Sequence, residues 1–150
     1  MRRKEREIQD REAIDAIIRE CRVCRLGLTD GKEPYVVPLS FGYDGESFYF
    51  HGASVGKKMD LLRQNNRVCV ELDILDELRP SEEACRWSAG YRSVIGFGTA
   101  ELVTDLESKR NALAIIMAHY SDGSYTFTDK ALEGTVVIKV TIASIAGKQS

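Results

Sequence analysis

Two short turns in the first third of the chain most limit the folds that it can adopt. Residues 23–28 and 35–41 both have the composition of β-strands, and only TDGKEP, with Asp-Gly at its centre, separates them. The segment YDGE then leads into a third strand, ESFYF. Connections this short join antiparallel strands, because a parallel pair needs a crossover of a dozen or more residues. The sequence therefore predicts an antiparallel sheet and argues against a parallel nucleotide-binding fold.

Three further strands and three helices complete the predicted architecture. The later strands are RVCVELDIL, YRSVIGFGTAELV and TVVIKVTIA. The first helix has apolar residues at helical spacing, namely Ile14, Ile17, Ile18 and Cys21. The second covers MDLLRQNN, and the third follows a capping box of Thr104 and Glu107. The inner stripe of that third helix is expected to hold Leu106, Leu113, Ile116, Met117 and Tyr120. The predicted fold class is mainly β, with one domain over residues 1–150 that forms a six-stranded curled antiparallel barrel with peripheral helices.

Two features in the second half of the sequence each allow two interpretations. Residues 74–90 are polar and aperiodic, which predicts a long connection of the kind that is functional or mobile. Trp87 within it either covers a ligand or anchors the connection to the barrel. Gly96 and Gly98 share one face of a predicted strand, which indicates either sheet curvature or close approach of a ligand.

Charge and cysteine content narrow the functional classes. A formal net charge of -2 gives no general attraction to nucleic acid or to an acidic membrane. No apolar run approaches the roughly 18 residues of a membrane span, so a cytoplasmic location is expected. Cys21 and Cys24 form a CxxC, which fits half of a zinc site or a redox pair. A second close pair is missing, so thiols buried like small apolar residues are the simpler interpretation, and no metal is predicted.

The segment HGASVGKK suggests a phosphate site. It lies between a predicted strand and a predicted helix, where free backbone N–H groups and the helix dipole attract an anion. Lys57 and Lys58 would oppose that dipole unless an anion shares the site. The segment is one residue short of a nucleotide-binding P-loop, and Lys58 stands where that loop has Ser or Thr for magnesium. A plain phosphate is therefore favoured over a nucleoside triphosphate, with a solvated helix start as the alternative.

The segment PYVVPLSF indicates an edge strand. Pro38 removes one donor from the hydrogen-bond ladder, so it belongs at a sheet edge or beside a bulge. Backbone groups of Val37, Leu39 and Ser40 are then free to address the polar rim of a flat heterocycle. Protection of a bare edge against aggregation is the alternative.

Together, PYVVPLSFGYDGESFYFHGASVGKKMDLLRQNNRVCVELD and CRWSAGYRSVIGFGTAELV resemble the pyridoxamine 5'-phosphate oxidase-like superfamily of FMN-binding split barrels. The similarity runs through essentially the whole chain and is strongest to the branch that includes 5-nitroimidazole-resistance proteins. It implies a homodimer that holds FMN at the interface between its subunits. The C-terminal SIAGKQS offers no counterpart to the residues that recognise pyridoxal phosphate in the oxidases, which argues against vitamin B6 oxidation.

The resemblance assigns cofactor contacts residue by residue. Lys57 and Lys58 match the basic pair that grips the FMN phosphate. The strand along the isoalloxazine ring is matched by Val37, Pro38, Leu39 and Ser40. The loop beside the ribityl chain is matched by Phe50, His51, Gly52 and Ala53. A strand that approaches from across the site, from the same subunit or its partner, is matched by Tyr91, Arg92 and Ser93.

These features predict an FMN-dependent oxidoreductase that passes electrons to a small, flat acceptor such as a nitroaromatic. His51, which can change its charge near neutral pH, is the candidate catalytic residue, while His119 is expected to be a helix-end cation. Two alternatives remain. One is a flavin carrier or redox sensor without turnover, and the other is a metal-binding barrel that uses Cys21, Cys24 and His51.

Overall fold

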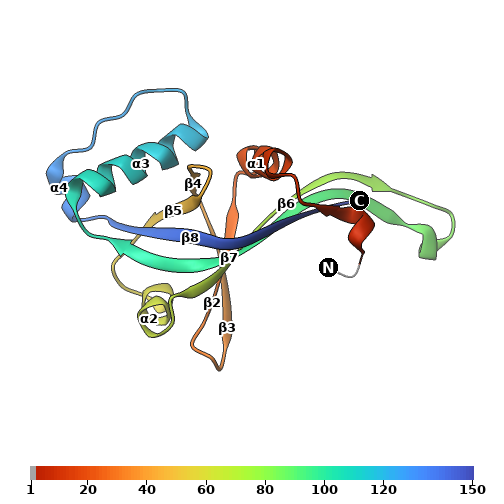
Figure 1. The fold of residues 1–150 in the computed structure, drawn as a ribbon, viewed down its shortest axis with the longest axis horizontal. Coiled ribbons are helices and arrows are strands. Elements are labelled where there is room, and N and C mark those ends of the chain that lie inside the picture. The colour runs from red at the N-terminus through yellow and green to blue at the C-terminus, as the bar shows by residue number, and fades with distance from the viewer. Residues whose placement is uncertain (1–2) are drawn as a thin grey trace.

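The computed structural model describes residues 3–150 as one curled antiparallel sheet with helices packed around it (Figure 1). Its elements in chain order are the 3-10 helix η1 (Lys4–Arg6), β1 (Glu7–Ile8), α1 (Arg11–Glu20), β2 (Cys24–Thr29), β3 (Pro34–Leu39), β4 (Gly42–Tyr43), β5 (Ser47–Gly52), α2 (Lys57–Gln64), β6 (Arg67–Arg79), the 3-10 helix η2 (Ala84–Arg86), β7 (Ser88–Val103), α3 (Leu106–Tyr120), α4 (Asp129–Glu133) and β8 (Val136–Gln149). The strand order is β3-β2-β6-β7-β8-β5-β4, and β1 adds to β8. This is the predicted antiparallel split-barrel architecture.

The six predicted strands are all present, and the structure adds two short ones. β1 and β4 have only two residues each, too few for a pattern in the sequence to reveal. The short helix α4, which was not predicted, lies between α3 and β8.

The prediction of a long connection over residues 74–90 is wrong for most of that range. β6 continues to Arg79 and β7 begins at Ser88, so the two strands pair as a hairpin that projects beyond the rest of the sheet (Figure 1). A register shift between Leu75 and Glu77 marks a β-bulge in it. Only residues 80–87, which include η2, connect the strands.

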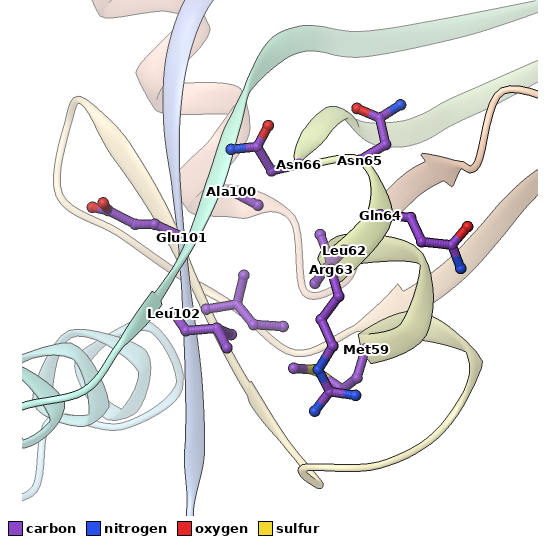
Figure 2. A pocket seen from close by; sticks show the side chains of 10 residues that line it. Met59, Leu62, Arg63, Gln64, Asn65, Asn66, Ala100, Glu101 and Leu102 are labelled. Carbon is purple, nitrogen blue, oxygen red and sulfur yellow. The ribbon is translucent and has the colours of Figure 1, made fainter.

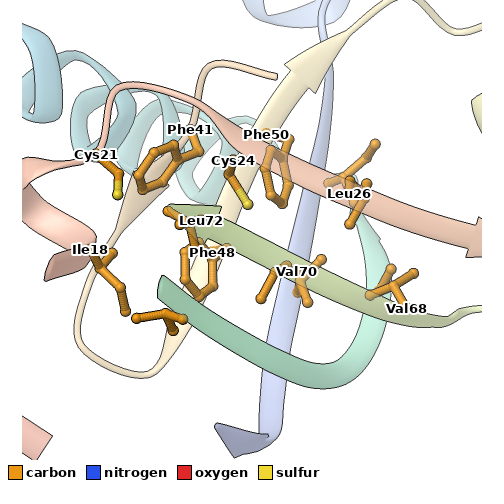
Figure 3. Packing of buried hydrophobic residues seen from close by; sticks show 14 of the residues in the cluster. Ile18, Cys21, Cys24, Leu26, Phe41, Phe48, Phe50, Val68, Val70 and Leu72 are labelled. Atoms are coloured by element: carbon orange, nitrogen blue, oxygen red, sulfur yellow. The ribbon is translucent and has the colours of Figure 1, made fainter. Parts of the chain in front are cut away.

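The core fills the inner face of the sheet. α1 contributes Ile14, Ile17 and Ile18, as its spacing predicted, and the cysteines at 21 and 24 are also buried there. Phe41, Phe48 and Phe50 are fully buried, and the first two rings lie 5.7 Å apart (Figure 3). The interior of the split barrel is therefore packed with its own side chains at this level.

The two longest helices, α1 and α3, both begin at an aspartate that caps the helix. Asp10 accepts a hydrogen bond from the backbone N–H of Ala13 at 3.1 Å at the start of α1. For α3 the predicted capping box is displaced by one residue, because Asp105 rather than Thr104 accepts from Ser108 N at 2.7 Å. The inner stripe of α3 is also narrower than predicted, with Ala112 and Ile116 as its buried residues.

Gly98 explains how β7 and β8 approach so closely. A Cβ at this position would lie 2.2 Å from the carbonyl oxygen of Thr141, and the register shifts between Phe97 and Gly98. A Cβ on Gly96 would meet the side chain of Val70 at 3.0 Å. Close packing of neighbouring strands at both glycines, with the register shift at Gly98, fits the interpretation of sheet curvature. Among the helices of residues 3–150, none is both long and apolar enough to cross a membrane.

Candidate functional site

The loop between β5 and α2 exposes the start of a helix. Gly56 is the N-cap residue, with a φ of 112° that favours glycine, and it offers no side chain to cap the helix. The N–H of Met59 bonds to the Gly56 carbonyl at 2.9 Å, whereas no acceptor among residues 3–150 pairs with the N–H groups of Lys57 and Lys58. Those two donors and the positive end of the helix dipole are therefore open to an anion.

The two lysine side chains diverge from this point. Lys57 Nζ lies 3.1 Å from Glu33 Oε2, in the turn between β2 and β3, and 5.0 Å from the centre of the Tyr35 ring. Lys58 Nζ instead lies over Gly52, where an added Cβ would be 2.9 Å away. Lys58 forms no ion pair within residues 3–150, and its partial burial lowers its pKa. An uncompensated, partly desolvated ammonium is well suited to a phosphate dianion.

β3 lies at the edge of the sheet, as Pro38 predicted. Within residues 3–150 it pairs only with β2, and Pro38 faces Arg25 in that register. Val37 and Leu39 turn inward and pack on the core, so only their backbone groups could contact a ligand. Because backbone groups alternate along a strand, half of those in β3 point away from β2 and meet no other strand.

His51 is exposed on β5 and pairs with Val137 of β8. Since side chains alternate along a strand, His51 projects from the face of β5 opposite to the buried Phe50. Gly52 and Ala53 follow it into the loop. The imidazole makes no hydrogen bond within the described chain, which leaves both ring nitrogens available.

The third predicted group lies at the far end of the same sheet. In register, Arg92 pairs with Ile74 and lies seven residues before Thr99, which pairs with Arg67 just after α2. The rise of about 3.3 Å per residue puts roughly 20 Å between these two levels. One subunit therefore does not bring Tyr91, Arg92 and Ser93 to Lys58.

Arg92 is also directed away from the outer face. It faces inward with Ile74, and its guanidinium bonds to Glu20 at 2.7 and 2.9 Å and to Asp76 at 2.7–3.2 Å. These hydrogen bonds lower the pKa of both carboxyl groups and raise that of Arg92. Tyr91 and Ser93 project from the opposite, outer face.

That outer face carries an apolar groove that the sequence analysis did not anticipate. One row of paired residues crosses five strands, from β3 through β2, β6 and β7 to β8, in the order Val36, Gly27, Cys69, Phe97 and Ser144. The small central residues leave a groove of about 610 Å³. A second groove of about 360 Å³ adjoins it at Phe97 and reaches Ser93. Phe97 is 54% exposed and Val36 is 61% exposed. The alternation of side chains along β7 places Phe97 on the face opposite to the core, and this was the signal in the sequence that could have revealed the groove.

A further cavity of about 410 Å³ lies between α2 and β7 (Figure 2). Met59 and Leu62 form its apolar side, and the Arg63 side chain runs across it. Arg63 donates to the carbonyl of Ser54 at 3.1 Å, which steadies the loop before α2. This cavity therefore lies behind the helix whose start is open, rather than at that start.

Cys21 and Cys24 are buried thiols and Cys69 is half-buried, whereas Cys85 is exposed, so the expectation of buried thiols is wrong for Cys85. Burial raises the pKa of Cys21 to about 11 and that of Cys24 further still. Among residues 3–150, no three metal-ligating side chains lie together, so Cys21, Cys24 and His51 do not form a site. His119 bonds to the carbonyl of Cys21 at 2.7 Å, a contact with another segment rather than with the end of its own helix. Trp87 donates to the Ser81 carbonyl at 2.6 Å and so ties its own connection together.

Comparison with known proteins agrees with the fold. The family model described as pyridoxamine 5'-phosphate oxidase matches residues 10–149. A candidate 5-nitroimidazole antibiotic resistance protein from Bacteroides thetaiotaomicron is 35% identical, with a TM-score of 0.87 over 95% of this chain and 86% of that one. A flavocytochrome from Azotobacter vinelandii is 26% identical, with a TM-score of 0.88 over 100% and 72%. A Mycobacterium smegmatis protein described as binding FAD and heme, 23% identical, shares the fold, with a TM-score of 0.88 over 97% and 73%. No curated protein matches the chain.

Proposed function

The chain belongs to the pyridoxamine 5'-phosphate oxidase family, and on that premise we propose that it is an FMN-dependent oxidoreductase. The observation that carries the proposal is the open start of α2. Two backbone N–H groups there have no partner among residues 3–150, and the ammonium of Lys58 lies beside Gly52, the glycine that ends β5. This set of donors fits a terminal phosphate monoester, which FMN has and FAD lacks.

The neighbouring edge strand suits the rest of the cofactor. β3 offers unpaired backbone donors and acceptors along one side, and these would orient the polar rim of the ring system. Loop residues from Gly52 to Gly56 would lie along the ribityl chain. When bound, the flavin supplies the electron chemistry, and the protein supplies position and charge.

The chain's own groups then have defined tasks. Lys58 and the N–H groups of α2 hold the phosphate, and Lys57 joins them when it leaves Glu33. The β3 backbone fixes the plane of the ring. His51 can donate a hydrogen bond from an imidazole nitrogen to negative charge on the acceptor, because it is exposed and makes no hydrogen bond within residues 3–150.

The outer face supports a homodimer as the assembled form. Val36, Ile95 and Phe97 are exposed apolar residues around two adjoining grooves, and an apolar patch of this kind marks an interaction surface. A two-fold axis would pair the patch with itself. The cofactor would then lie between one subunit's α2 and the other subunit's β7.

The acceptor that best fits is small and flat. A nitroaromatic such as a 5-nitroimidazole is the first compound to test, since the structure at 35% identity is described as a candidate nitroimidazole resistance protein. The purified protein should show flavin absorbance and should oxidise NADH or NADPH when a nitroimidazole is added. A yellow protein without turnover would make it a carrier or sensor, and failure to bind FMN would overturn the proposal.

A further inference from the structure

The β6–β7 hairpin forms an arm that, beyond its base, pairs with no other strand among residues 3–150. Beyond Leu75, and among the residues that the structure describes, β6 and β7 pair only with each other up to the pair formed by Arg79 and Ser88. Figure 1 shows this arm, residues 75–91, extending past the rest of the sheet with η2 at its tip. A two-stranded hairpin alone is marginally stable in water, so an arm of this length calls for a partner surface.

The arm is amphipathic because of its bulge. Leu75 pairs with Tyr91 and Leu78 pairs with Ala89, and Ala89 and Tyr91 lie on the same face of β7. The extra residue at the bulge brings Leu75 and Leu78 to this face despite their spacing of three. Leu75 is 60% exposed, Leu78 62% and Trp87 at the tip 55%. Three large apolar side chains are thus displayed to solvent on one small element.

The apolar face of the arm continues the outer face of the barrel. Tyr91, Ser93, Ile95 and Phe97 occupy alternate positions of β7 and therefore project from the same side. The opposite side of the arm is fixed to its own subunit, because Arg92 joins Asp76 at the arm's base to Glu20 of α1. The apolar side is thereby held in a set orientation.

Sheet register identifies the surface that this arm would meet. His51 lies in one row with Val137 and Val103 across β5, β8 and β7, six residues beyond Phe97, and His51 is the exposed member of that row. Tyr91 lies six residues before Phe97 on the same strand. A two-fold axis that passes Phe97 at right angles to β7 would bring the Tyr91 row of one subunit to the His51 row of the other, about 20 Å from the axis at 3.3 Å per residue. The arm would extend just past that row.

Charge agrees with this placement. Residues 75–90 hold four carboxylates and two guanidinium groups, whereas residues 53–67 around α2 hold four basic side chains and one carboxylate. Opposite net charges favour the approach of the arm to the partner's α2.

We propose that the arm of each subunit closes over the flavin site of its partner, with Leu78 and Trp87 as the apolar cover of the ring and the acceptor. This inference rests on the proposed FMN site and names the element that selects acceptors. A flat aromatic compound fits between a flavin and an indole, whereas a bulky or strongly hydrated one does not. Trp87 is then a specificity-determining residue supplied by the other subunit.

Trp87 is the only tryptophan of the chain, so its emission reports directly on the arm. In a titration of the wild-type protein with FMN, the Trp87 emission should fall by more than half with the same Kd as the flavin's own fluorescence change. Flavin binding without loss of Trp87 emission would overturn the arm inference and leave the proposed function intact. Absence of flavin binding would overturn both.

A mixed dimer separates the two subunits. One protomer carries W87F and keeps the lysines, and the other keeps Trp87 and carries K57A and K58A, with FMN set at a level that the second alone does not bind. After subunit exchange, FMN should quench the emission, because the only tryptophan now faces the only loaded site from across the interface. Unchanged emission in mixed dimers, confirmed by native mass spectrometry, would contradict the placement.

Discussion

Lys58 should contribute more than Lys57 to FMN binding, although the two are adjacent in the sequence. Lys58 Nζ has no carboxylate partner within residues 3–150 and lies over Gly52, at the end of β5. Lys57 Nζ is already 3.1 Å from Glu33. A phosphate must therefore displace Glu33 before it can use Lys57, but not before it uses Lys58.

The difference can be given a magnitude. A hydrogen bond to a charged group contributes about 1.5–3 kcal/mol, so Lys58→Met, which keeps the aliphatic stem, should weaken FMN binding about 10- to 150-fold. An exposed ion pair contributes about 0–1 kcal/mol, so Lys57→Met should cost up to about 1 kcal/mol less than Lys58→Met. For the same reason Glu33→Gln should tighten binding, by about fivefold at most. Replacement of both lysines by alanine should cost several kcal/mol.

Quenching of FMN fluorescence on binding measures these affinities, with Lys130→Met on α4 as the matched control that loses one surface lysine elsewhere. Because burial lowers the Lys58 pKa and only the ammonium form binds phosphate well, affinity should start to fall at a lower pH than the ordinary lysine range of about 10.4. A larger loss for Lys57→Met than for Lys58→Met, or weaker binding by Glu33→Gln, would refute the reasoning.

Three further results are expected. Gly98→Ala places a Cβ against a strand backbone that cannot move without loss of its ladder, so chemical denaturation should show a loss of about 3 kcal/mol, and an unchanged midpoint would contradict this. Arg92 hydrogen bonds lower the pKa of Glu20 and Asp76, so their stabilising effect is present above the unfolded-state values of about 4 and is lost as pH falls through the lower native ones. Because Arg92 joins the arm to α1, dimer dissociation, followed by light scattering, should increase at acid pH in the wild type and depend less on pH in Arg92→Met. Equal pH profiles for the two proteins would contradict this role of Arg92. A thiol reagent should modify Cys85 rapidly in the native protein and the remaining cysteines only after unfolding or slowly, which timed mass spectrometry can follow.

The strands were predictable because their signals are local. Asp-Gly turns and alternating residues determine β2, β3 and β5 without knowledge of distant contacts. The arm was not predictable in the same way. Its bulge puts Leu75 and Leu78 on one face at a spacing of three, which matches neither strand nor helix periodicity, and its polar residues resemble a loop.

The start of α3 shows that two neighbouring residues can compete for the N-cap position. Thr104 and Asp105 are both good N-cap residues, and the capping box favours Thr104 because of Glu107. In the structure the Asp105 carboxylate takes the bond from Ser108 N, so the helix starts one residue later.

For the candidate site, the sequence located the groups but not their partners. The glycine loop with its lysine pair is one short segment of the chain, and the strand that contains Pro38 is another. Each has the local structure that the sequence predicted. The diversion of Lys57 to Glu33 and of Arg92 to Glu20 depends on contacts 24 and 72 residues away in sequence. Such long-range choices, like the apolar row at Phe97, become visible only when the sheet is assembled.

Native mass spectrometry of the protein with FMN tests the central claim most directly, namely that two copies of this chain hold the flavin between them. We predict a dimer that carries two FMN molecules, and loss of both flavins together with the dimer when Phe97 is replaced by Glu. A monomer that retains FMN with the wild-type affinity, or a stable dimer that never takes it up, would contradict the account.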